Sequence, residues 1–449
     1  MTELVSPRPP SADAEPSEAY RAWVLFILVV VYAFNFIDRQ IVGILAIPIK
    51  ADLGLSDLQL SLMGGLAFAL IYSFLGIPVA WLADRTSRSW IMTAALAIWS
   101  AMTMACGLAQ NFIHLFLARL GVGIGEAGGV APAYALVADY FPPKRRARAL
   151  ALYSLGIPIG SALGVVLGGV LNEWLGWRQA FLIVGGLGLL LAPIFRLTLR
   201  EPQRGRYDGA AAALKPAPIG DVFKALSRKR SFWMLTFGAA SSSMMGYGLI
   251  FWLPCFFVRS FGDELPGFFA WLPSFLVPES AGATFYAGYF FGSILLVGGV
   301  IGIAAGGWLA DWLGPKDRAY YARLPAWAFA TSLPFFFLGV LGDTLWVTFL
   351  AFMVIQAMVL VWLGPVLTAF QHLVTPNMRA TASAVFLFVN NLVGIGLGNL
   401  IIGGLSDFLA GRLGEESLRY AIVSGSVFYV IAAALFFLVA PRLRDDWIG

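Results

Sequence analysis

The sequence predicts an all-α membrane protein of twelve transmembrane helices arranged in two six-helix halves. Three observations lead to this fold class. The 449 residues are 59% hydrophobic and only 12% charged, whereas soluble domains carry roughly 25% charged residues. The apolar residues form runs long enough to cross a bilayer, and several segments of the first half recur in the second. A soluble globular protein is therefore excluded.

The apolar runs divide the chain into regions, because a transmembrane helix needs about 20 predominantly apolar residues. The runs predict spans at 22–45, 58–83, 89–110, 113–138, 147–171, 177–198, 231–257, 284–310, 321–341, 345–370, 380–405 and 418–440. The regions that follow are a disordered, Pro- and Ser-rich tail at 1–21, a first bundle at 22–198, a linker at 199–230, a second bundle at 231–440 and a tail at 441–449.

The basic residues predict the orientation of these spans. Most of them fall on the side of the membrane that holds both chain ends, and the connections on the other side contain only Lys50, Arg178, Arg259, Arg412 and Arg419. Because Lys and Arg are enriched in cytoplasmic loops, we expect an integral protein of the inner (plasma) membrane with both termini in the cytoplasm. Orientation explains the net charge of +5 without a nucleic-acid partner. We expect the protein to act as a monomer.

The long apolar connection at 258–283 lies on the other side of the membrane. It predicts either a short helix on the outer surface or a loop packed over the bundle.

An internal repeat supports the division into halves. AWLADRTSR at 80–88 recurs as GWLADWLGP at 307–315, FPPKRRARA at 141–149 as VTPNMRATA at 374–382, and GGVLNEWLG at 168–176 as GGLSDFLAG at 403–411. The three pairs keep their order and nearly the same offset. Duplicated six-helix halves are a transporter architecture, in which the binding site lies at the interface of the halves near the middle of the membrane.

The loop at 82–88, LADRTSR, resembles the cytoplasmic signature of the major facilitator superfamily, although Ala80 and Ser87 replace its usual glycines. The resemblance implies a latch on the cytoplasmic side, to which five residues are assigned: Asp84, Arg85, Arg88, Asp139 and Asp311. Asp84 would lie at the N-terminal end of the 380–405 helix, where free backbone donors attract a carboxylate. Arg85 and Arg88 would bind Asp139. Charges that serve topology alone would explain the arginines but not the paired Asp84 and Asp311.

Four stretches resemble the spinster family of the same superfamily: NFIDRQIVGIL at 35–45, RLGVGIGEA at 119–127, DYFPPKRRARALALYSLGIPIGSALG at 139–164 and DRAY at 317–320. Spinster proteins are linked to the proton-coupled export of sphingosine-1-phosphate, other sphingolipids and lysophospholipids. The resemblance therefore implies a small amphipathic lipid as the substrate and protons as the coupling ion. The first two stretches also resemble proton-coupled symporters of small organic anions, which are the alternative.

Four ionisable residues inside predicted spans are the candidate working parts: Asp38, Arg39, Arg119 and Glu126. A charge near the bilayer centre costs at least about 2.5–3.5 kcal/mol. At 1.5 Å per residue, Asp38 lies roughly 24 Å into a ~30 Å core from the inside and Arg119 roughly 9 Å from the outer edge, so their levels match. Since these two helices line the cavity in the superfamily, we expect Asp38 to face Arg119, with Glu126 two turns deeper. Arg39 points about 100° away from Asp38.

These residue types predict complementary roles. A guanidinium holds a phosphate or carboxylate with two parallel hydrogen bonds, so Arg119 and Arg39 are assigned to substrate binding. A carboxylate that loses its cationic partner in a low dielectric takes up a proton, so Asp38 and Glu126 are assigned to proton coupling. The alternative is a permanently satisfied buried ion pair.

Other classes of function lack the residues that they need. The histidines, His114 and His372, stand near span ends, and the cysteines, Cys106 and Cys255, lie in apolar spans. No Ser–His set or metal-ligand spacing is present, so we expect neither an enzyme nor a metal or organic cofactor. A membrane sensor would need a sizeable soluble output domain, which the apolar sequence does not provide.

Overall fold

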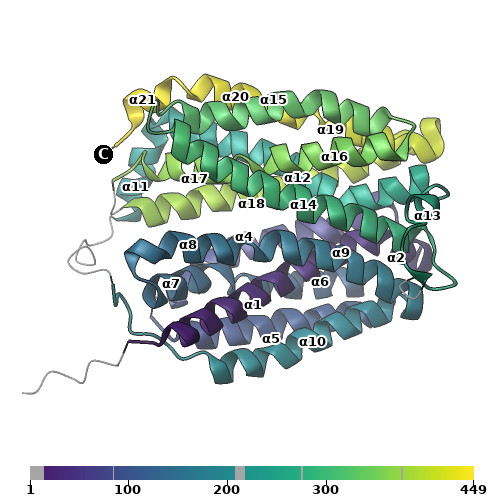
Figure 1. Ribbon diagram of the computed structural model, residues 1–449, viewed down its shortest axis with the longest axis horizontal. Coiled ribbons are helices and arrows are strands. Elements are labelled where there is room, and N and C mark those ends of the chain that lie inside the picture. The colour runs from purple at the N-terminus through teal and green to yellow at the C-terminus, as the bar shows by residue number, and fades with distance from the viewer. Residues whose placement is uncertain (1–14, 84, 208–217, 275–276, 376–377, 449) are drawn as a thin grey trace, which may run out of the picture.

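The computed structural model describes residues 15–83, 85–207, 218–274, 277–375 and 378–448. These residues form two helical halves that lie one above the other with their long helices nearly parallel (Figure 1). The start of the first helix and the last helix lie at one end of the bundle, called here the terminus end. The opposite end is called the far end. The predicted fold class is confirmed.

The first half consists of six spans, and several of them are built from two helices in series. Their bounds are α1 at Glu18–Ile44; α3, η1 and α4 together at Asp57–Ala83; α5 at Arg88–Gly107; α6 at Phe112–Glu126 followed by α7 at Val130–Tyr140; α8 at Pro143–Ser154 followed by α9 at Gly156–Leu175; and α10 at Trp177–Thr198. Side-chain caps begin several of them, as where Ser87 accepts a hydrogen bond from the Trp90 amide. The short α2, Ala46–Leu53, joins the first two spans at the far end.

The second half repeats this arrangement. Its spans are α12 at Arg230–Phe261, α14 at Ala283–Leu313, α15 at Tyr320–Leu341, α16 at Leu345–Leu360 followed by α17 at Leu363–Gln371, α18 at Arg379–Leu413, and α19 at Ser417–Gly425 followed by α20 at Val427–Val439. Among the described residues, eleven segments are long and apolar enough to span a membrane. The last of them, Thr381–Val439, passes through the short η5 (Gly414–Glu416) and contains both α18 and α20, so it crosses twice.

The segments outside the spans differ from the sequence-based expectations. α1 begins at Glu18 rather than 22, because Ser17 caps it by accepting from the Tyr20 amide. The region expected as a linker contains α11, Ile219–Arg228. The region expected as a tail contains α21, Arg442–Asp446, whose Leu443 is fully buried. α21 is held further by Arg444, which donates to both carboxylate oxygens of Asp317 at 2.8 and 2.5 Å.

The far-end connection at 258–283 packs over the bundle, as one of the two readings expected. Between the end of α12 at Phe261 and the start of α14 at Ala283, the described residues contain one α-helix, the four-residue α13 at Leu265–Phe268. Leu265 is fully buried, and the Phe268 ring contacts Trp346 and Phe349 with centroids 4.3 and 5.4 Å away. These contacts place apolar side chains of the connection on the second half rather than on a lipid surface.

The two halves meet along three seams: α9 packs on α14, α1 on α12, and η1 with α4 on α18. One apolar core runs through the second half and into the first half, from Phe329 and Phe436 to Ile41 and Val165. A separate core lies within the first half, around Val24, Trp99 and Tyr140. The halves therefore share a core over part of their length, and the first half keeps one of its own.

Close backbone approach inside the first half generates a stability prediction. A Cβ on Gly160 of α9 would lie 2.7 Å from the Cα of Ala33 in α1. We expect Gly160→Ala to push the two helices apart and to destabilise the folded protein by about 1–3 kcal/mol, the usual cost of overpacking. The matched control is Gly186→Ala in α10, where a Cβ meets nothing within 4 Å. Thermal unfolding in detergent should show a lower midpoint for the first variant alone; equal midpoints would contradict the packing described here.

Candidate functional site

The centre of the bundle contains a buried ion pair between α1 and α6. Arg39 Nε donates to Glu126 Oε2 at 2.7 Å, and the two side chains are 13% and 0% exposed. The guanidinium also lies between three aromatic rings, with its carbon 5.1 Å from the centroid of Phe36, 4.7 Å from that of Phe68 and 5.1 Å from that of Tyr72. The aromatic faces offer a cation further favourable contact in a site removed from water.

Asp38 and Arg119 lie next to each other, as their matching depth predicted, but they do not form the expected side-chain pair. Arg119 Nη1 lies 3.5 Å from the backbone oxygen of Asp38. The two residues are 2% and 1% exposed. Among the described residues, neither Asp38 Oδ1 nor Arg119 Nε has a hydrogen-bond partner. Buried polar atoms are rarely left unpaired, so these two atoms require an explanation.

The pairing of Arg39 with Glu126 corrects the expected arrangement. Sequence reasoning matched residues by depth alone, which placed Glu126 two turns away from the level of Asp38. Arg39 points away from Asp38 around the axis of α1. Its long side chain spans the difference in depth and reaches Glu126. Glu126 is the last residue of α6, and the next helix, α7, begins at Val130.

The two arginines, Arg39 and Arg119, line a small cavity between the halves. The first half contributes Phe36, Arg39, Gln40, Gly64, Phe68 and Arg119 to its wall; the second contributes Tyr247, Ile250, Phe251, Ile395 and Asn399. Its volume of about 30 Å³ is roughly the share of one water molecule in the liquid. The site is therefore closed in this conformation. Sequence analysis gave no role to the aromatic and aliphatic residues of the wall, since they look like ordinary span residues.

A second ionic cluster lies at the terminus end of the first half. Arg88 Nη1 donates to Asp139 Oδ2 at 2.5 Å, and Arg88 Nε donates to Glu201 Oε1 at 2.8 Å. The same guanidinium donates to the backbone oxygens of Ala135 and Pro202 at 3.3 and 3.2 Å. The expected contact between Arg88 and Asp139 is thus present, and the segment after α10 closes around it.

Glu201 is a member of this cluster that the sequence analysis missed. It accepts hydrogen bonds from the Ser89 amide at 2.9 Å and from the Ser87 hydroxyl at 3.0 Å. Partial burial of Glu201 by itself opposes ionisation, but the hydrogen bonds from Ser89 and Arg88 outweigh burial and hold the pKa of Glu201 below its usual value. The only available sequence signal was an acidic residue directly after a span.

The other expected latch residues behave differently. Arg85 does not reach Asp139; its guanidinium lies 4.0 Å from the Trp81 ring centroid and donates to the Trp81 oxygen at 3.2 Å. Arg85 lies two residues beyond the end of α4, and its side chain folds back along that helix instead of crossing to α7. Asp311 is exposed and forms no ion pair with the described residues. Asp84 lies outside the described residues.

The described residues contain no group of three or more His, Cys, Asp and Glu side chains that could hold a metal ion. Both cysteines are buried as free thiols.

Comparisons with known proteins agree with this architecture. The model of the Major Facilitator Superfamily matches residues 28–398. An MFS-type efflux pump of Mycolicibacterium smegmatis is 34% identical over 95% of both chains. Protein spinster homolog 1 of Mus musculus is 26% identical over 96% of this chain and 82% of its own length.

Two solved structures are similar along nearly the whole chain. A bacterial homolog of the human lysosomal transporter spinster, inward-facing and unoccupied, gives a TM-score of 0.81 at 31% identity, covering 97% of this chain and 100% of that one. A structure of a bacterial spinster homolog in the inward-facing and occupied conformation gives a TM-score of 0.78, with the same identity and coverage.

The terminus-end cluster generates a second prediction. Arg88→Lys keeps the charge but cannot serve four acceptors in different directions. We expect this variant to lower the free energy of unfolding by about 1.5–3 kcal/mol, the usual contribution of a hydrogen bond to a charged group. Arg85→Lys is the matched control, because Arg85 is exposed and surface changes usually stay within about 0.5 kcal/mol. Thermal unfolding in detergent measures both variants, and an unchanged Arg88→Lys protein would argue against a supporting role for the cluster.

Proposed function

The chain belongs to the major facilitator superfamily and is homologous to the spinster proteins, and from this premise we propose that it is a proton-coupled transporter of anionic amphipathic lipids. As a member of this family of transporters, it is not an enzyme. The proposed substrates are lysophospholipids or sphingolipids resembling sphingosine-1-phosphate. The proposed orientation places both termini in the cytoplasm.

The single observation that carries the substrate class is the unequal distribution of charge between the halves. The buried Asp, Glu, Lys and Arg side chains among the described residues all belong to the first half: Arg21, Asp38, Asp57, Arg88, Arg119, Glu126 and Asp139. The second half lines the central cavity with Ile250, Phe251 and Ile395, together with the polar Tyr247 and Asn399. A ligand with a charged headgroup and an apolar chain matches such a wall. A small polar anion would leave the apolar side without a partner, which favours the lipid over the alternative.

Arg119 is the proposed headgroup ligand. The residue is 1% exposed, and its Nε lacks a hydrogen-bond partner among the described residues. Arg39 already donates to Glu126. A phosphate or carboxylate that accepts from Arg119 would supply the missing partner with bidentate geometry. Arg39 then contributes positive charge at longer range and positions Glu126.

The proposed coupling follows from the charge balance of the central site. Asp38, Arg39, Arg119 and Glu126 together carry no net charge when all are ionised. An anionic headgroup adds negative charge in a low dielectric, where an unbalanced charge costs several kcal/mol. Protonation of Asp38 or Glu126 restores neutrality, so substrate binding and proton binding favour each other. Alternating conformations with different affinities for the proton would then convert a pH gradient into transport.

The closed central cavity is consistent with a moving site. A volume of about 30 Å³ holds no lipid headgroup, so the halves must separate on one side before substrate binds. Similarity to a structure in the inward-facing conformation supports a state that opens at the terminus end and is closed at the far end.

A third prediction tests headgroup recognition. Arg119→Lys keeps the positive charge and removes the planar guanidinium that forms two parallel hydrogen bonds. We expect uptake of a fluorescent lysophosphatidylglycerol into proteoliposomes to fall at least about tenfold, because a charge-assisted hydrogen bond contributes about 1.5–3 kcal/mol and 1.4 kcal/mol corresponds to tenfold. Arg178→Lys is the control, since Arg178 is paired with Asp52 near the far end. Normal uptake by Arg119→Lys would contradict direct recognition. Uptake of gluconate but not of the lipid would favour the small-anion alternative.

A fourth prediction tests the coupling sites. Asp38→Asn and Glu126→Gln remove a titratable carboxylate while keeping its shape. Each variant should still exchange labelled lysolipid across the membrane of proteoliposomes, but should fail to accumulate it under an imposed pH gradient. The measurement is the ratio of accumulation to exchange with and without the gradient. Full pH-driven accumulation by both variants would place the proton sites elsewhere.

A further inference from the structure

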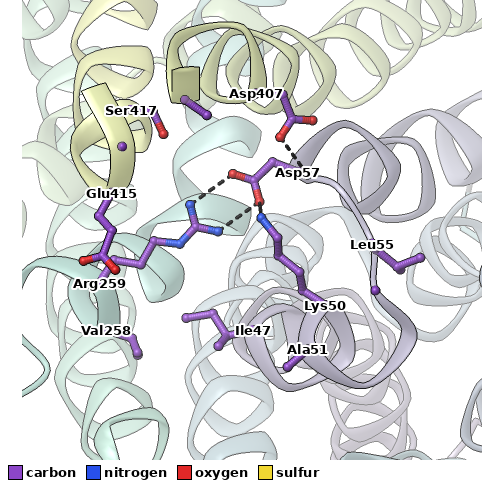
Figure 2. Close-up of a pocket in the computed structure, with 13 residues that line it drawn as sticks. Ile47, Lys50, Ala51, Leu55, Asp57, Val258, Arg259, Asp407, Glu415 and Ser417 are labelled. Atoms are coloured by element: carbon purple, nitrogen blue, oxygen red, sulfur yellow. Dashed lines mark hydrogen bonds and ion pairs between the residues drawn. The ribbon is translucent and has the colours of Figure 1, made fainter. Parts of the chain in front are cut away.

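An ionic cluster at the far end joins the two halves around one carboxylate. Figure 2 shows Asp57 between Lys50, from its own half, and Arg259, from the opposite half. Asp57 stands at the start of α3, Lys50 lies in α2, and Arg259 lies in the last turn of α12. The central site described above uses none of these three residues.

Each carboxylate oxygen of Asp57 accepts two hydrogen bonds from side chains. Arg259 donates through Nη1 to Oδ2 at 3.0 Å and through Nη2 to Oδ1 at 2.9 Å, which is the bidentate arrangement. Lys50 Nζ donates to Oδ1 at 2.6 Å, and the Ser406 hydroxyl donates to Oδ2 at 2.9 Å. The Asp57 side chain is only 3% exposed. Two of its three partners, Arg259 and Ser406, belong to the second half.

A second carboxylate makes the contact reciprocal. Asp407 of α18 accepts from the backbone amides of Asp57 at 3.1 Å and Leu58 at 2.7 Å. Each half thus offers an acidic side chain to donors of the other half. α18 and α3 approach closely because Gly403 of α18 faces α3. A Cβ at this position would lie 2.7 Å from the backbone oxygen of Asp57 and would collide with the Ser61 hydroxyl.

The cluster lies between the central site and a larger cavity. Phe251 and Asn399 of the central wall precede Arg259 and Asp407 by eight residues each, about 12 Å along their helices. Lys50, Asp57, Arg259 and Asp407 also line a cavity of about 770 Å³ at the far end. Along α18, the contact with α3 therefore lies between Asn399 of the central wall and Ala410 of the far-end cavity.

We propose that Asp57 and Arg259 form the far-side gate of the transport path, with Lys50 and Asp407 as the counter-charges that remain when the gate opens. The gate rests on the proposed function insofar as it requires two alternating conformations, but it does not depend on the identity of the substrate. When the halves separate, Asp57 keeps Lys50 within the first half. Arg259 keeps the nearby carboxylate Asp407, which lines the same cavity wall, within the second half. Neither gate residue becomes an isolated charge, which makes the opening reversible.

The experiment measures the distance between the halves at the far end by pulsed electron spin resonance in nanodiscs. Spin labels are placed on cysteines at Leu108 and Asp343, which are exposed after α5 and after α15. The native Cys106 and Cys255 are 0% and 1% exposed and stay in place. Asp57→Asn and Arg259→Gln should each raise the population with the longer distance at least about tenfold, equivalent to about 1.4 kcal/mol.

Two matched variants separate a gate from a general structural role. Asp52→Asn removes an ion pair with Arg178 that lies near the far end but wholly within the first half, so its distance distribution should equal that of the wild type. Lys50→Gln removes the cation that stays with Asp57 after opening, so it should not increase the longer-distance population. The proposal is overturned if Asp57→Asn and Arg259→Gln resemble Asp52→Asn, or if Lys50→Gln opens the far end as they do.

The same variants, also assayed for lysolipid transport in proteoliposomes, distinguish this proposal from the proposed function. The distances are measured without lipid substrate or pH gradient. A protein that transports no lysolipid but opens on loss of Asp57 would retain the gate and lose the substrate assignment. A protein that transports lysolipid but keeps its far-end distance in both gate variants would do the reverse.

Discussion

Burial of charge in a low dielectric is the constraint on which the rest of this structure depends. Four ionisable side chains lie in the central part of the first half, and each must find a partner or remain costly. Arg39 pairs with Oε2 of Glu126, three aromatic rings enclose the arginine, and Oε1 of Glu126 has no hydrogen-bond partner among the described residues. Asp38 and Arg119 remain partly unsatisfied among the described residues. Arg39 and Glu126 are joined by a side-chain ion pair, whereas Arg119 reaches only the backbone of Asp38, so the first pair suits holding the site and the second suits responding to ligands.

The division between the halves follows from this constraint. The first half carries the buried charges and has an apolar core of its own, which includes Val24, Trp99 and Tyr140. The second half presents apolar side chains such as Phe251 and Ile395 to the central cavity. The first half is thus suited to binding a charged group. The second half offers the central cavity an apolar surface that can shift without breaking hydrogen bonds. Polar groups that must find new partners after every movement would make such sliding expensive.

Ionic clusters at the two ends of the bundle differ in what they connect. At the terminus end, Arg88, Asp139 and Glu201 tie the segment after α10 to its own half. At the far end, Asp57 and Arg259 join opposite halves. The first kind of cluster makes a half move as one body. The second kind decides whether the halves meet, so the same chemistry serves rigidity at one end and control of access at the other.

Resemblance to the superfamily implied the contact between Arg88 and Asp139, and the sequence by itself determined the spans, the duplicated halves and the four central charges. These features depend on hydropathy, helical rise and repeated motifs, all of which are local along the chain. Only the tertiary structure decided that Arg39 rather than Arg119 holds a carboxylate, that Arg85 lies on Trp81, and that Asp57 meets Arg259. Depth in the membrane follows from counting residues, but the rotation of each helix about its axis and the docking of the halves follow from packing over the whole interface. Those two quantities decide which charges touch.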